Sequence, residues 1–304
     1  MKDLGHLSYL LGLEITHSTN GLYITQAKYA SKLLSWAGLT DSKIVDTPVE
    51  LNAHLTPTGE KPLSNPSHYR RLVGNLVYLT ITHPDISYAV HQVSQYLFAP
   101  RSTHYAVVLC ILRYLKGTLF HDLFYFAQSP LVLRVFSNAD WAGDPTNRRS
   151  TTSYCFLLGS SLISWQSKKQ THMARSSTEA EYRALADTTS ELLWLRWLLK
   201  DLGVSTSSTT SLYCDNQSVI HIAHNDVFHE QTKHIEINCH FICYHLVHGT
   251  LKFILVSSKN QLANLFTKSY PKGRLRTLVD NLKLVSNPPW VWGELLMCIR
   301  VCGL

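Results

Sequence analysis

The chain contains no two consecutive aspartates in its 304 residues, and its acidic residues are few, with 21 Asp and Glu against 28 Lys and Arg. A catalytic site that binds two divalent ions through carboxylates can therefore draw on few acidic side chains in this sequence. Apolar residues form no uninterrupted run near the ~20 that a membrane-spanning helix needs. Even the apolar tail, 287–304, is interrupted by Glu294 and Arg300, so we expect no membrane partner.

Cysteine is present, but not with the spacing of a disulfide framework. The seven cysteines are an odd number and form no paired doublets of the kind that zinc sites use. Cys239 and Cys243, with His240 and His245 nearby, come nearest to a metal site, but ordinary helix residues explain them better. With no signal peptide after Met1, we expect a reducing intracellular compartment, cytoplasmic or nuclear, and no disulfide-linked partner.

Composition indicates a folded, basic chain that can hold two domains. Hydrophobic residues make up 45% and aromatic residues 11%, while the net charge is +7 with a pI near 9.0. This balance suits a polyanionic partner. The pairs Arg148-Arg149 and Lys168-Lys169 are candidate nucleic-acid contacts, although any one basic pair is more often only a solvated surface.

Apolar spacing predicts a hairpin followed by helices in the first part of the chain. The expected elements are strands over 7–15 and 21–25, a helix over 26–38, a linker over 48–66, and helices over 69–115 with breaks at Pro84 and Pro100.

The second part predicts three strands, then helices alternating with strands. The expected strands are 131–137, 154–158, 162–166, 211–214 and 251–256, and the expected helices are 178–202, 217–224, 232–248 and one from Asn260. Ser176 and Glu179 stand in capping-box register at the start of the long helix. Further along, a broad apolar face is formed by Trp194, Leu195, Trp197, Leu198 and Leu199. This order predicts an α/β sheet with mixed pairing.

Four segments in chain order carry a family resemblance. They read S-N-A-D-W-A-G from Ser137, S-S-T-E-A-E-Y from Ser176, L-Y-C-D-N from Leu212, and N-Q-L-A-N from Asn260. In this order they resemble the ribonuclease H domain of copia-type LTR retrotransposon Pol polyproteins. M-K-D-L-G at Met1 and the segment Tyr69 to Leu79 resemble the end of the reverse transcriptase in the same family.

The resemblance implies a ribonuclease H-like mixed sheet with flanking helices, preceded by a hairpin and helical region derived from reverse transcriptase. We expect a palm-end or thumb-like remnant over 1–60, a helical connection-like region over 61–124, a ribonuclease H-like domain over 125–286 and a non-family tail over 287–304. The family's paired-aspartate polymerase motif lies upstream of M-K-D-L-G. Because this chain has no such pair, we expect no polymerase activity from it.

The resemblance also implies a site that uses Mg²⁺ or Mn²⁺ to cleave the RNA strand of RNA–DNA hybrids. Its four acidic positions map to Asn138, Glu181, Asp215 and Asn264, so Glu181 and Asp215 are the remaining metal ligands. Glu181 is preferred to Glu179, which suits the helix cap. The alternative role for Asp215 is that of a turn residue at the end of a strand. Its Tyr-Cys-Asp-Asn context favours the role in the site.

The family has Asp where this chain has Asn138 and Asn264. An amide offers a neutral oxygen and an NH₂ donor in place of a charged oxygen pair, so we expect metal to bind weakly or not at all. Asp140 is a candidate substitute, but it stands about 7 Å further along the strand. We therefore expect an impaired nuclease that keeps affinity for RNA–DNA hybrid or duplex. The alternatives are an inert remnant and a host-adopted interaction module, which no sequence feature favours.

Overall fold

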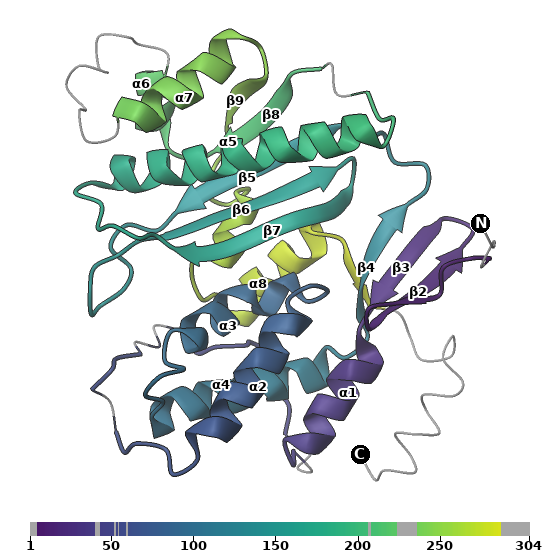
Figure 1. The fold of residues 1–304 in the computed structure, drawn as a ribbon, viewed down its shortest axis with the longest axis vertical. Coiled ribbons are helices and arrows are strands. Elements are labelled where there is room, and N and C mark those ends of the chain that lie inside the picture. Colours follow the sequence, from purple (N-terminus) through teal and green to yellow (C-terminus); the bar gives the residue numbers. More distant parts are fainter. Residues whose placement is uncertain are drawn as a thin grey trace. The chain divides into compact units, whose positions relative to one another are not determined.

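The structure is a computed structural model that describes residues 5–39, 43–51, 53, 55–58, 60–205, 208–223 and 236–286. The tail over 287–304 and much of the stretch between the expected helices 217–224 and 232–248 lie outside the described residues. The chain divides into two compact units, one of them made of two chain segments and the other being Ser129–Lys268 (Figure 1).

The first unit, residues up to Gln128 together with those from Ser269, contains an antiparallel sheet in the order β1-β2-β3-β4-β10. Its strands are β1 (Tyr9–Leu10), β2 (Leu13–Ser18), β3 (Gly21–Thr25), β4 (His121–Phe126) and β10 (Leu284–Ser286). The expected strand over 7–15 is divided because Leu11 and Gly12 both take positive φ, 49° and 82°, and form a two-residue hairpin turn. The sequence did not predict β4 or β10, which pair with each other.

Helices complete this unit, and several of them start at or just after a proline. They are α1 (Ala27–Trp36), α2 (Pro66–Leu79), the 3₁₀ turn η1 (Pro84–Ile86), α3 (Ser87–Ser94), α4 (Ser102–Gly117) and α8 (Lys272–Asn281). Pro66 fits the first turn of α2, where its missing N–H costs nothing, and the Asn65 side chain accepts a hydrogen bond from the His68 N–H at 3.1 Å. The predicted breaks at Pro84 and Pro100 are confirmed.

The second unit contains a mixed sheet in the order β7-β6-β5-β8-β9. Its strands are β5 (Leu133–Ala139), β6 (Thr151–Leu158), β7 (Ser161–Lys169), β8 (Thr210–Cys214) and β9 (Leu251–Leu255). The central β5 is antiparallel to β6, with Asn138 opposite Ser153, and parallel to β8, with Phe136 opposite Tyr213. The carboxyl ends of β5 and β8 therefore meet at one edge, beside the start of β6.

Helices flank this sheet and bury one apolar stripe each. They are α5 (Ser177–Asp201), α6 (Gln217–Ala223) and α7 (Glu236–Val247), followed by the 3₁₀ turn η3 (Leu262–Phe266). In α5, Leu195 and Leu199 face the core, whereas Trp194 and Trp197 are 52% and 66% exposed. The expected apolar face is thus narrower than predicted, because only residues on one side of the helix reach the sheet.

The expected fold class is confirmed: the chain has a mixed α/β sheet with flanking helices, and an additional antiparallel sheet with helices. The compact unit built on the mixed sheet ends at Lys268, whereas the sequence suggested a domain reaching residue 286. The difference comes from Pro271, which starts a separate helix, α8, and from β10, which pairs with β4. The helix expected from Asn260 is only the short turn η3.

Candidate active site

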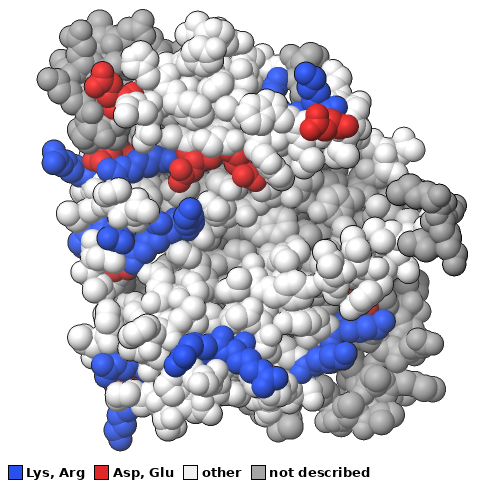
Figure 2. All heavy atoms as spheres, in the orientation of Figure 1, with Lys and Arg blue, Asp and Glu red and all other residues white. Residues whose placement is uncertain are grey.

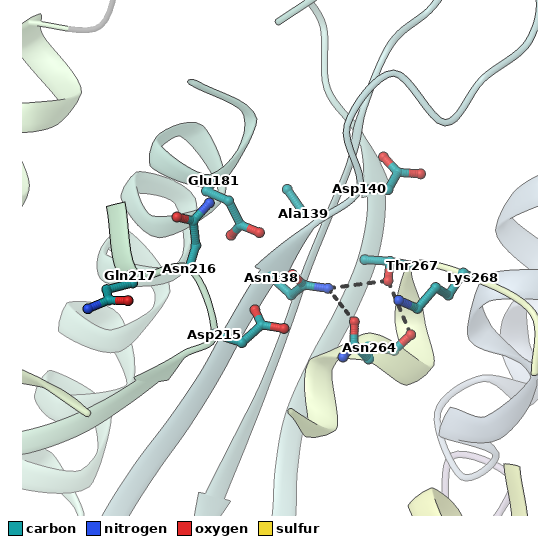
Figure 3. A pocket seen from close by; sticks show the side chains of 10 residues that line it. All are labelled: Asn138, Ala139, Asp140, Glu181, Asp215, Asn216, Gln217, Asn264, Thr267 and Lys268. Carbon is teal, nitrogen blue, oxygen red and sulfur yellow. Dashed lines mark hydrogen bonds between the residues drawn. The ribbon is translucent and has the colours of Figure 1, made fainter. Parts of the chain in front are cut away.

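Four chain segments far apart in sequence bring Asn138, Glu181, Asp215 and Asn264 to the walls of one cavity of about 340 Å³ (Figure 3). Asn138 lies at the end of β5 and Asp215 directly after β8, at the edge where the two parallel strands finish. Glu181 comes from the second turn of α5, and Asn264 from η3. The carboxyl ends of parallel strands are where α/β sheets commonly form binding sites.

The buried side chain of Gln261 fixes η3 to the sheet. Its Nε2 donates hydrogen bonds to the backbone oxygens of Ser137, at 2.9 Å, and Tyr213, at 3.3 Å, on the neighbouring strands β5 and β8. Its Oε1 accepts from the Ala263 N–H at 3.3 Å, at the start of η3. One carboxamide therefore forms hydrogen bonds with backbone groups of three segments. These bonds explain why a glutamine suits this position of the N-Q-L-A-N segment.

Asn138 and Asn264 bind each other directly. The Nδ2 of Asn138 donates to the Oδ1 of Asn264 at 2.7 Å and lies 3.4 Å from the Thr267 hydroxyl. The Nδ2 of Asn264 donates to the Ser258 backbone oxygen at 3.1 Å. Both side chains are buried, with 6% and 2% exposure, so these bonds are shielded from water. Two amides can pair in this way because each carries both a donor and an acceptor.

Two carboxylates could not replace this bond in the same geometry. At 2.7 Å, unit negative charges repel by roughly 6 kcal/mol at an effective dielectric constant of about 20. That exceeds the net ~1 kcal/mol of an ordinary hydrogen bond. Aspartates at both positions would therefore need a cation or a proton between them, or would move apart.

The two acidic side chains of the predicted set differ in their surroundings. Asp215 accepts a hydrogen bond from the Ser258 hydroxyl at 2.7 Å and is half-buried. Glu181 is 6% exposed, and its Oε2 has no hydrogen-bond partner. The pKa of Glu181 is raised to about 8, chiefly by burial and also by the neighbouring Asp215 and Asp140 carboxylates, while a hydrogen bond with the Ala139 backbone lowers it. At neutral pH this carboxyl is therefore largely protonated.

Glu179 has a structural role, as its position in the sequence suggested. Its backbone N–H donates to the Ser176 hydroxyl at 3.1 Å, and its carboxylate accepts from the Arg175 N–H and the Arg183 guanidinium, at 2.7 and 2.5 Å. Glu179 does not line the cavity, whereas Glu181 does.

Asp140 lines the same cavity but faces elsewhere. Its carboxylate accepts a hydrogen bond from the Thr151 N–H and lies against Gly143, where an added Cβ would collide with it. In Figure 3 it points away from the Asn138 amide. The net pKa of Asp140 is raised to about 6, because the effect of burial exceeds the lowering by the Thr151 hydrogen bond and by the charges of Lys169 and Lys268. In this orientation the side chain does not replace Asn138.

The predicted basic residues lie at the same end of the sheet, where β6 starts and β7 ends. Lys168 pairs with Thr152 and Lys169 with Thr151, and Arg148 and Arg149 directly precede β6. Figure 2 shows Lys and Arg side chains gathered at the left, where Figure 1 draws these strand ends. Arg148, Arg149 and Lys168 are exposed, but Lys169 forms an ion pair with Asp144 and so helps to hold the loop.

Sequence reasoning did not single out Thr267 and Lys268, which also line the cavity. They follow Asn264 by one helical turn, and that spacing is the signal that could have revealed them. The Thr267 hydroxyl donates to the Asn264 backbone oxygen at 3.1 Å, and Lys268 brings a positive charge near Asp140.

The residues present do not fit a pair of divalent ions. Such ions need several carboxylates, whereas two of the four predicted positions are amides bonded to each other, and Asp140, which also lines the cavity, accepts a hydrogen bond from the Thr151 N–H. Across the described ranges, no three His, Cys, Asp or Glu side chains are grouped so as to hold a metal ion. Cys239 and Cys243 are buried in α7, where Cys239 packs into the hydrophobic core.

The strand order and the flanking helices are those of a ribonuclease H-like fold. No family model matches the chain. It is 39% identical over 295 residues to the Pol polyprotein from transposon RE2 of Arabidopsis thaliana. This alignment covers 97% of the chain and 20% of that polyprotein. It is 36% identical over 296 residues to the Pol polyprotein from transposon TNT 1-94 of Nicotiana tabacum, covering 94% and 22%. The chain thus spans about a fifth of the length of these relatives.

The chain belongs to the family of copia-type retrotransposon Pol polyproteins. Among solved structures, it is similar to a foamy viral protease-reverse transcriptase in complex with double-stranded DNA, at 13% identity and a TM-score of 0.46. That similarity covers 83% of this chain and 38% of the other. No helix of the described part is long and apolar enough to cross a membrane.

The first testable prediction concerns the pH dependence of stability. The folded-state pKa of Glu181, about 8, lies above its ordinary 4.5, so the folded protein binds the extra proton and loses stability as pH rises through this window. The loss approaches about 1.4 kcal/mol per pH unit for one proton. Glu181→Gln should flatten this slope in denaturant titrations with chelator present. Glu236→Gln, at an exposed position, is the control, and an unchanged slope in Glu181→Gln would disprove the assignment.

The second prediction concerns metal removal. The unmodified chain should unfold at the same temperature with chelator or with Mg²⁺, because the amide pair needs no cation. Asn138→Asp with Asn264→Asp should lower the unfolding temperature by roughly 5–10 °C in chelator and recover it in Mg²⁺. Asn147→Asp with Asn260→Asp adds the same charges at exposed positions and should show neither effect. A metal-dependent shift in the unmodified chain would contradict the prediction.

Proposed function

We propose that the second unit derives from a metal-dependent ribonuclease acting on RNA–DNA hybrids, and that this chain has lost most or all of that activity. The supporting observation is the Asn138–Asn264 hydrogen bond, which stands where the family has two acidic side chains. Hydrolysis of a phosphodiester needs an activated water and a neutralised leaving oxygen, which carboxylate-held ions supply. Only Glu181 and Asp215 remain as candidate ligands, so Mg²⁺ or Mn²⁺ binds weakly or not at all.

We further propose that the unit still binds RNA–DNA hybrid or duplex nucleic acid. Arg148, Arg149 and Lys168 are exposed beside the cavity, at one end of β6 and β7, and the loop that carries the arginines is held by the Lys169–Asp144 ion pair. Such cations bind phosphates without regard to base sequence. An inert remnant is the alternative, and it predicts no affinity even at low salt.

The third prediction tests catalysis. With Mg²⁺ or Mn²⁺, the unmodified chain should leave a labelled RNA–DNA hybrid uncut. Asn138→Asp with Asn264→Asp should raise the cleavage rate by about 100-fold or more, because each restored carboxylate helps to hold ions worth several kcal/mol of transition-state stabilisation. Each single reversion should regain less.

The control for this assay is Asn147→Asp with Asn260→Asp, which should stay inactive. Full activity in the unmodified chain would mean that Asp140 or another acid holds the ions. An inactive double reversion with an intact fold would mean that the damage, or a missing requirement, lies elsewhere in the protein.

The fourth prediction tests binding. The affinity for a blunt RNA–DNA hybrid should fall as salt rises, and Arg148→Ala with Arg149→Ala should lower the slope of log affinity against log salt by about one to two. Lys252→Ala, on the edge strand β9, should leave the slope unchanged. If the arginine variant and the unmodified chain had equal salt slopes, Arg148 and Arg149 would not belong to the binding surface.

A further inference from the structure

Trp141 is a large aromatic side chain held in place beside the cavity. It follows Asp140 directly and is 55% exposed. Its indole Nε1 donates a hydrogen bond to the Ala174 backbone oxygen at 3.2 Å. Ala174 lies just before α5, the helix that carries Glu181, so the bond joins two loops at the site's end of the sheet. An anchored indole with more than half of its surface in water has apolar area available for a ligand.

The loop that carries Trp141 is held at several points. The Asp140 N–H continues the strand pairing by donating to the Thr151 backbone oxygen at 3.2 Å, and the Ala142 N–H donates to the Ser150 hydroxyl at 3.1 Å. Further along, the Asp144 carboxylate accepts from the backbone N–H groups of Thr146 and Asn147, at 2.6 and 3.0 Å. The indole is therefore fixed before any ligand arrives, so that little conformational entropy is lost on binding.

The surroundings of Trp141 distinguish it from Trp194 and Trp197. Arg148 and Arg149 belong to the same loop and are exposed. A fixed aromatic face next to exposed cations is the combination that binds single-stranded nucleic acid, by base stacking and phosphate contacts together. Trp194 and Trp197 are equally exposed, but they lie in the later turns of α5, and Trp197 is ~24 Å along the helix from Glu181.

We infer that Trp141 stacks on an unpaired nucleotide at the rim of the cavity, so that the unit prefers a hybrid with a single-stranded extension to a blunt one. This inference rests on the proposed nucleic-acid binding. Inside a duplex both faces of each base are covered by its neighbours, and a side chain reaches a face only if the base leaves the stack. An unpaired nucleotide offers its face without that cost.

The test measures affinity for a blunt RNA–DNA hybrid and for the same hybrid with a short single-stranded RNA extension at one end or the other. The unmodified chain should bind one of the extended hybrids at least about fivefold more tightly than the blunt one. Trp141→Ala should remove this preference while leaving affinity for the blunt hybrid and the salt slope unchanged. Trp141→Phe, which keeps an aromatic face, should retain most of the preference, and Trp197→Ala should retain all of it.

The outcomes separate the two proposals. Binding of the blunt hybrid with no preference for either extension, or a preference that survives in Trp141→Ala, would overturn the stacking role and leave the proposed binding intact. No binding of any hybrid at low salt would overturn the proposed binding and the stacking role with it. A thermal unfolding curve for each variant shows that a lost preference does not come from a lost fold.

Discussion

The candidate site depends on the buried carboxamide of Gln261, which holds the ends of two parallel strands and the turn that follows them. Its two donated hydrogen bonds reach β5 and β8 at the edge where the strands finish. Ser153 adds a second brace, because its hydroxyl lies 3.1 Å from the Asn138 backbone oxygen and 2.9 Å from that of Ala263. Asn264 therefore lies opposite Asn138 because of uncharged groups alone. The framework has no need of the ions that the family's chemistry requires.

Because uncharged groups hold the strand ends and η3 together, the site keeps its shape with amides at positions 138 and 264. Carboxylates gathered for catalysis repel one another and weaken the fold unless cations are bound, whereas the Asn138–Asn264 pair stabilises the same contact directly. Under the proposed function, amides at these two positions would favour stability at the expense of metal binding, which is a common trade-off at functional sites. Glu181 remains a buried carboxyl at this site, and its pKa is raised chiefly by burial and also by the neighbouring Asp215 and Asp140 carboxylates.

Much of the mixed sheet could be predicted from the sequence, because each strand and helix has its own apolar period and its own end signals. The long helix is an example, from the Ser176 cap to the stop at Gly203. The pairing of β10 with β4 could not, because β10 is a three-residue strand whose partner lies more than a hundred residues earlier. At the site, motif spacing predicted that four polar positions would meet at one edge, and all four line one cavity. It could not show that the two amides would bind each other, or that Asp140 would turn toward Thr151, because both depend on side-chain geometry.

The pairing of β4 with β10 also has a consequence for the order of synthesis. The unit formed by Ser129–Lys268 is encoded entirely between these two strands, so it is an insertion within the other unit. A ribosome synthesises all of the inserted unit before it adds α8 and β10. The sequence of the inserted unit is thus complete before the sheet of the surrounding unit has its last strand. A transcript that stopped early would still yield the nuclease-like unit, but would leave the edge of β4 open to pairing with another chain.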